Sequence, residues 1–139
     1  MEKDETEAKG GTDLSSLNLL EHGEVAKPLT IVHPVSGEPL GIEMMVLSGD
    51  SRTAREMHRR NQRSRIKMAP SKRLDPDDIE RQGVRVLAAL IKSWKGVEWK
   101  GEALPCTFDN AVMVLTELSW LRNQVDTFAH EAGNYIEGN

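Results

Sequence analysis

The segment that begins at Asp75 constrains the fold most strongly, because it carries the start, the spacing and the stop of a long helix. Asp75 is a preferred capping residue, and Pro76 suits the first helical position. Small or apolar residues then recur at helical spacing until a stop near Gly96. This series consists of Ile79, Gly83, Val86, Leu87, Leu90, Ile91 and Trp94. The pattern predicts the central core helix of the protein.

Three further stretches are predicted to be helical. One follows Asp50-Ser51, which suits a helix cap, runs from position 52 to about 66, and is expected to end before Pro70. A second begins after Thr107, another capping residue, and a last helix is predicted from about 119 to 136. Each of the last two carries apolar residues at helical spacing. The connections are short, so these helices are expected to form a compact bundle.

Residues 28–47 carry the pattern of a β-hairpin. Two β-rich runs flank a turn segment that contains Pro, Ser and Gly. On the second run, Ile42, Met44 and Val46 share one strand face, whereas Met45 lies on the other. Both faces are therefore expected to be covered. Because an isolated hairpin is only marginally stable, a helix or another chain is expected beside it.

The predicted fold class is mainly α with a small β-hairpin (α+β), a compact helical bundle preceded by a disordered N-terminal arm. The chain has 139 residues, which suits one modest domain with flexible ends. Residues 1–26 contain seven acids and the pair Gly10-Gly11, which predicts an acidic flexible arm. Residues 27–139 are predicted to form a single helical domain. Within it, residues 95–106 contain two glycines and a proline and are expected to form a structured loop.

The sequence carries no recognisable metal or catalytic motif. The four histidines lie on four different predicted elements, without the spacing that brings two imidazoles to one metal. They are His22, His33, His58 and His130. The acidic residues that follow position 74 could suggest a cation site, but capping of the predicted central helix already explains them. No catalytic residue, cofactor or metal is expected, and the chain is predicted not to be an enzyme.

Cys106 is the only cysteine, which excludes an internal disulfide and clustered thiolate metal sites. Its place before a helix N-terminus suits either a reactive thiol or a small buried hydrophobe. The second interpretation is favoured, because no nearby His or Asn suggests activation of the thiol. No apolar run approaches the length that crosses a bilayer, and the acidic N-terminus does not resemble a secretory signal. The expected compartment is therefore the cytoplasm.

Charge is distributed unevenly along a chain whose formal net charge is −4. Residues 52–73 hold nine Lys or Arg against one acid, whereas the remaining residues hold nine basic and 21 acidic side chains. At 100° per residue, four arginines of the predicted helix fall along one stripe, with a thin apolar face roughly opposite. This basic stripe consists of Arg52, Arg55, Arg59 and Arg63. It can present positive charge to an anionic partner.

Two interpretations of the basic stripe remain open. Phosphate backbones bind such stripes, so the chain can be a nucleic-acid-binding regulator. The alternative is a solvated or protein-binding face. It is favoured, because residues 52–73 contain no aromatic side chain to stack on a base and the whole chain is acidic.

The order of these features resembles that of the tail assembly chaperones of long-tailed bacteriophages (siphophages). The resemblance covers about residues 28–136 and is carried by two motifs. The first is the block from Trp94 to Ala111, in which a Trp, a Gly, an apolar residue and a Pro precede an Asn-containing helix start. The second is the helix segment Trp120-Leu121-Arg122-Asn123-Gln124-Val125, followed by Asn134-Tyr135-Ile136.

The resemblance implies a non-enzymatic chaperone that binds the tape measure protein in the host cytoplasm before the tail tube polymerises around it. The tail tube protein is a further partner to consider, a homo-oligomer stays open, and a structural component of the tail is the alternative function. Aromatic residues tend to anchor interfaces, so Trp94, Trp99, Leu104 and Trp120 are candidate partner contacts. The competing interpretation is that the three tryptophans complete the core of an aromatic-poor domain.

Overall fold

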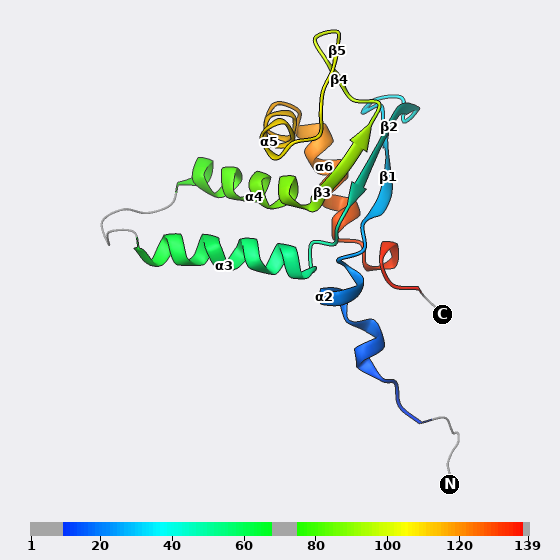
Figure 1. Cartoon of the computed structure of the whole chain (residues 1–139), viewed down its shortest axis with the longest axis vertical. Helices are drawn as coiled ribbons and strands as arrows, with labels where there is room; N and C mark the ends of the chain where they lie inside the picture. The colour runs from blue at the N-terminus through cyan, green and yellow to red at the C-terminus, as the bar shows by residue number, and fades with distance from the viewer. Residues whose placement is uncertain (1–9, 68–74, 138–139) are drawn as a thin grey trace.

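The computed structural model describes residues 10–67 and 75–137, and these form an α+β fold of helices around a small antiparallel sheet (Figure 1). The first nine residues of the predicted arm and Pro70 lie outside the described residues. The elements in chain order are η1 (Leu14–Leu17), α2 (Leu19–His22), β1 (Lys27–Val32), β2 (Pro39–Val46), α3 (Arg52–Lys67), α4 (Pro76–Leu90), β3 (Ile91–Lys95), β4 (Glu98–Trp99), β5 (Glu102–Ala103), α5 (Phe108–Glu117), α6 (Ser119–Ala129) and η2 (Ala132–Asn134).

The predicted hairpin is confirmed, and it forms two strands of a three-stranded antiparallel sheet. β2 lies in the centre, paired with β1 on one side and β3 on the other. Ile31, Met44 and Val46 are buried on the face that the helices cover. Helix α6 contacts β1, and α4 leads directly into β3. These helices supply the support that an isolated hairpin lacks.

The predicted central helix is too long by one turn. It ends at Leu90, and residues 91–95 form strand β3 instead. A bulge in the β2–β3 pairing explains the error, because Val46 pairs with Ile91 while Met44 pairs with Trp94. The extra residue in β3 brings two side chains three positions apart onto the same face, although a regular strand alternates every second residue. That spacing imitates the period of a helix.

The segment predicted as a loop, residues 95–106, contains a short hairpin. Strands β4 and β5 pair across Lys100 and Gly101, whose φ angles are 52° and 87°. Two consecutive positive φ angles are typical of a type I′ turn, which is usually formed by Asn-Gly or Asp-Gly. Lys100 does not carry that signature, so the sequence did not indicate the turn. The hairpin extends beyond the sheet at the end opposite the N-terminal segment (Figure 1).

The last helix is also shorter than predicted. It ends at Ala129, and a 3-10 turn at 132–134 returns the chain toward the sheet. Tyr135 is then buried, donates a 2.9 Å hydrogen bond to the Val46 carbonyl, and meets the Phe128 ring edge to face. The apolar pattern past Ala129 therefore does not mark a helix: Ala132 is exposed and Ile136 is half-buried, whereas Tyr135 is the buried residue of this segment.

The predicted helix starts are confirmed. Asp75 accepts a hydrogen bond from the Asp78 amide, with Pro76 in the first turn, and Thr107 accepts one from the Asn110 amide. Helix α3 begins at the predicted position, with the Ser51 hydroxyl 3.3 Å from the Ala54 amide. No helix of the described residues combines the length and the apolar character needed to cross a bilayer.

The end of the N-terminal segment is held against the start of α3. The Glu24 carboxylate accepts hydrogen bonds from the backbone amide and the hydroxyl of Thr53. Glu21 forms an ion pair with Arg52. Gly23 is buried, and a Cβ at this position would lie 2.6 Å from the Ser48 Cβ atom, so close packing here requires glycine. These contacts fix residues 21–24 to the domain.

Because Tyr135 is buried, we expect the folded state to lose stability at alkaline pH. Burial raises the pKa of Tyr135 to about 12 from an ordinary value of 10.0. Between these pH values the unfolded chain loses the phenol proton first, so the free energy of unfolding falls as the pH rises through this window. Tyr135 is the only tyrosine. Its tyrosinate absorbance should therefore titrate near pH 12 in the folded protein and near 10 in urea; a midpoint near 10 in both states would contradict the buried geometry.

Candidate functional site

A groove of about 670 Å³ lies between the edge of the sheet and helix α6. Strand β1 and the turn after it form one wall, and α6 with the residues that follow it forms the other. The lining residues are Leu29, Thr30, Val32, His33, Pro34, Val35, Ser36, Gly37, Asn123, Gln124, Thr127, Phe128, Glu131 and Asn134. The two walls come from segments about 90 residues apart, so no local sequence pattern indicates the groove.

The groove combines apolar surface with amide and hydroxyl groups. Leu29, Val32 and Phe128 are partly buried, whereas Val35 on the turn is 88% exposed. Glu131 is the only Asp, Glu, Lys or Arg among the lining residues. Val35 thus exposes apolar surface that the fold of the domain does not bury. The groove can therefore hold an apolar group of another molecule with little electrostatic contribution.

The Gln124 side chain forms hydrogen bonds with the edge strand β1 beside the groove. Its amide nitrogen donates to the Val32 carbonyl at 2.9 Å, and its amide oxygen accepts from the Val32 N–H at 3.0 Å. A side-chain amide thus provides the pair of hydrogen bonds that a neighbouring strand would otherwise provide. Pro28 also lies on β1, where it lacks an N–H to offer. Both features protect an edge strand from pairing with another chain.

The turn that carries Val35 is held by His33. The Nδ1 atom of His33 accepts hydrogen bonds from the amides of Val35 and Ser36, at 3.1 and 3.2 Å. Gly37 closes the turn with a φ of 76°, which favours glycine. Because its Nδ1 atom accepts these two hydrogen bonds, the His33 ring has a structural role in the turn. Val35 is therefore presented to solvent by an ordered turn.

Neither a metal-binding cluster nor an activated thiol is found among the described residues. Among residues 10–67 and 75–137, no group of three His, Cys, Asp or Glu side chains could hold a metal ion. Cys106 is partly buried, and desolvation raises the pKa of its thiol, which disfavours the reactive thiolate. Its environment therefore matches the interpretation as a small hydrophobe. His130 lies against Asp126 with Nδ1 3.1 Å from a carboxylate oxygen, but both side chains are largely exposed.

The four predicted partner contacts are all partly buried and pack against the core. Trp94 and Leu104 are brought together, since the Trp94 indole N–H donates a 2.7 Å hydrogen bond to the Leu104 carbonyl. This bond ties β3 to the segment that follows the β4–β5 hairpin. Trp99 belongs to that hairpin, and Trp120 lies in the first turn of α6. These side chains contribute to the packing of the domain. Their role as partner contacts stays a prediction.

The four arginines of the basic stripe all lie on the exposed side of α3. Arg52 is paired with Glu21, and Arg59 lies 3.4 Å from Glu56. The helix packs against α4 on its opposite side, where Ala54 is fully buried. The basic stripe and the groove therefore belong to different elements of the protein. Comparisons of the chain with protein-family models, curated proteins and solved structures find no match.

Replacing Gln124 by Ala should destabilise the edge of the sheet. Two hydrogen bonds to Val32 are lost, which is expected to lower the free energy of unfolding by about 1–3 kcal/mol. Amide hydrogen exchange at Val32 should become faster than in the wild type. Asn123→Ala is the matched control, because Asn123 neighbours Gln124 and lines the same groove but makes no hydrogen bond to β1 among the described residues. Equal effects of both substitutions would contradict the role of Gln124.

Proposed function

We propose that this chain is a non-enzymatic chaperone of phage tail assembly, and that its groove holds apolar side chains of the tape measure protein. The groove between β1 and α6 is the observation that carries the proposal. It is open to solvent, partly apolar and separate from the ionic surface of α3. The resemblance of the block from Trp94 to Ala111 to the siphophage chaperones supplies the identity of the partner. The site of action would be the host cytoplasm.

A chaperone of this kind has to cover the apolar surface of the long, helical tape measure protein until the tail tube encloses it. An amphipathic helix presents apolar residues at every third or fourth position. A groove of about 670 Å³ lies within the range of protein pockets that bind ligands of moderate size, and it can accept a few such side chains. Several copies of a small chaperone, each covering one short stretch, would then keep the partner soluble.

The hydrogen bonds of Gln124 favour side-chain recognition over strand addition. An extended peptide that joined the sheet beyond β1 would have to displace the Gln124 amide from Val32. A helical partner needs no hydrogen bonds from that edge, because its own backbone groups are paired within the helix. Because Glu131 is the one charged lining residue, binding in the groove should depend weakly on salt.

The test is co-expression with the tape measure protein of the same phage genome, followed by affinity capture and size-exclusion chromatography with light scattering. Val35→Asp combined with Thr127→Asp places two carboxylates in the groove and should weaken the complex at least tenfold, because apolar contacts are lost and charges are desolvated. Both positions are exposed, so the domain should remain folded.

Val25→Asp combined with Thr116→Asp is the matched control, with the same chemical changes at exposed positions outside the groove. This variant should bind as the wild type does. Equal binding by both double variants would exclude the groove as the binding site. Absence of any complex with the wild-type chain, and recovery of the protein in finished tails, would replace the chaperone function with that of a structural tail component.

A further inference from the structure

Helix α3 carries an almost continuous cationic surface. Seven of its 16 residues are Arg or Lys, against the single acid Glu56. At 100° per residue, six of the seven fall within an arc of about 140°. We call these six residues the basic face: Arg52, Arg55, Arg59, Arg60, Arg63 and Lys67, all of them exposed. The seventh, Arg65, lies outside this arc and donates a hydrogen bond to Gln82 of α4.

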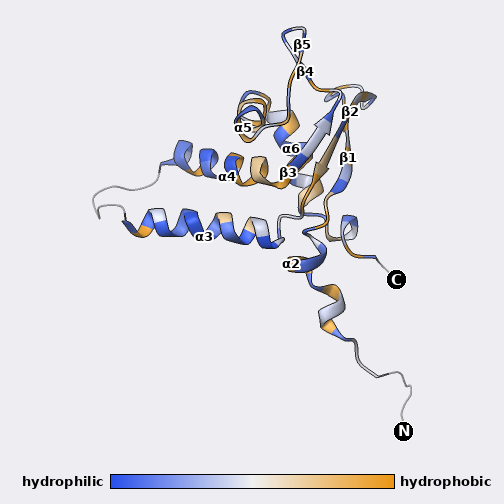
Figure 2. Ribbon diagram, viewed as in Figure 1, coloured by the Kyte–Doolittle hydropathy of each residue, from blue (hydrophilic) through white to orange (hydrophobic). Residues whose placement is uncertain are grey.

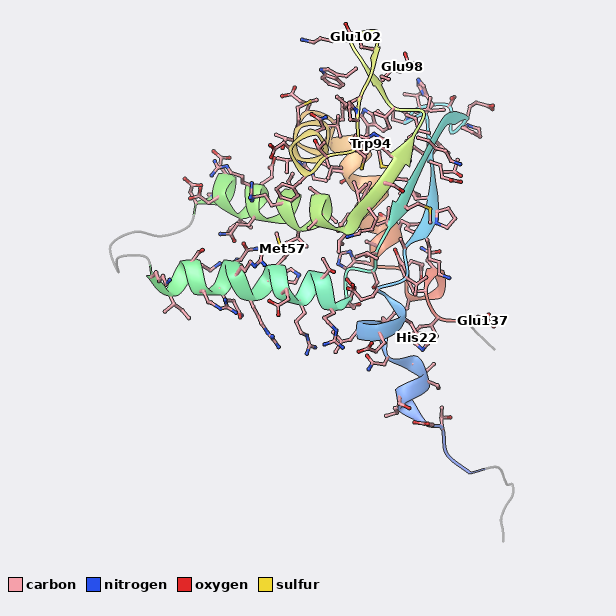
Figure 3. All side chains as sticks on the ribbon, in the orientation of Figure 1. His22, Met57, Trp94, Glu98, Glu102 and Glu137 are labelled. Atoms are coloured by element: carbon pink, nitrogen blue, oxygen red, sulfur yellow. The ribbon has the colours of Figure 1, made fainter. Side chains whose placement is uncertain are left out.

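Most of the basic face points away from α4 and the sheet, although Arg52 pairs with Glu21 of the N-terminal segment and Arg55 lines a small pocket with His130. Figure 1 shows α3 and α4 side by side, extending from the sheet as a pair, and Figure 2 shows that most of α3 is hydrophilic. The side of α3 that faces α4 carries Ala54 and Met57, the latter labelled between the two helices in Figure 3. The opposite side carries the basic face along about 22 Å of helix.

The acidic side chains of the described residues neutralise only part of the positive charge of the basic face. On the basic face, only Arg52 and Arg59 lie within ion-pair distance of a described carboxylate. Two of the three acids of neighbouring α4 have cations of their own, since Asp78 is 2.8 Å from Arg81 and Glu80 is 3.3 Å from Arg122; Asp77 has no ion pair among the described residues. The positive field of α3 is therefore not cancelled by its nearest structural neighbour, although the chain as a whole is acidic.

The sequence alone favours a solvated or protein-binding face, but the composition of this exposed surface favours a nucleic acid over a protein as its partner. Protein interfaces depend on apolar or aromatic anchors near their centres. The basic face contains no such residue, and the one large exposed apolar side chain of α3, Ile66, lies near its C-terminal end. Interfaces with DNA are more positively charged, and half or more of their hydrogen bonds go to phosphate and sugar oxygens. Arginine suits phosphate because its planar group can donate two parallel hydrogen bonds.

We infer that the basic face of α3 binds the phosphate backbone of duplex DNA. An α-helix with its side chains is about 10–12 Å wide, which matches the major groove of about 12 Å. Duplex rather than single-stranded nucleic acid is expected, because α3 has no aromatic side chain on which an unpaired base could stack. This binding surface is separate from the groove, so the inference is independent of the chaperone function.

The experiment measures fluorescence anisotropy of a labelled duplex DNA of about 20 base pairs with the full chain, between about 50 and 200 mM salt. Wild-type protein should bind, with affinity that falls steeply as salt increases. Arg55→Ala, Arg59→Ala and Arg63→Ala together should weaken binding at least tenfold at low salt. They should also reduce the slope of log affinity against log salt by about 2.7, since each lost phosphate contact contributes about 0.9.

A matched control removes three exposed cations elsewhere: Arg85→Ala, Lys92→Ala and Lys95→Ala. This variant has the same net charge as the α3 variant and should bind within about twofold of the wild type. Circular dichroism checks that all variants keep their helices. The inference is overturned if the wild type does not bind the duplex at low salt, or if both triple variants lose equal affinity. Equally tight, equally α3-dependent binding of poly-glutamate would instead assign the basic face to an acidic protein.

Discussion

The pairing of β3 with β2 is the interaction on which the other features of the structure depend. It joins two segments about 50 residues apart and buries Val46 and Ile91 together. Because α4 leads into β3 without a loop, and the Leu47 amide donates to the Leu90 carbonyl, the pairing also fixes the direction in which α4 leaves the sheet. Helix α3 packs on α4 and takes its orientation from it. Both proposed binding surfaces are thus positioned by one small sheet.

The two surfaces differ in the forces available to them. The groove beside β1 offers apolar area and one formal charge, so its affinity would come from burial and shape. The basic face of α3 offers concentrated charge and no apolar anchor, so its affinity would come from phosphate contacts and counterion release. Salt dependence therefore separates them, and a chain of this size can carry both because they lie on different elements.

The sequence predicted the parts of the fold that depend on local chemistry. Capping by Asp75 and Thr107 located two helix starts, and the turn residues between positions 33 and 39 located the hairpin. It failed where tertiary contacts override local pattern, as at β3, where a bulge imitates helical spacing. The basic stripe was visible because charge periodicity is local. The groove was not, because Gln124 reaches β1 only after the chain has folded.

Hydrogen exchange on the complex with the tape measure protein tests the central claim most directly. If the groove is the binding site, residues 29–37 and 123–134 should exchange more slowly in the complex than in the free protein. The β4–β5 hairpin and α3 should exchange at unchanged rates. Protection around Trp99 and Trp120, with no change between residues 29 and 37, would contradict the claim and move the binding site to the predicted tryptophan contacts.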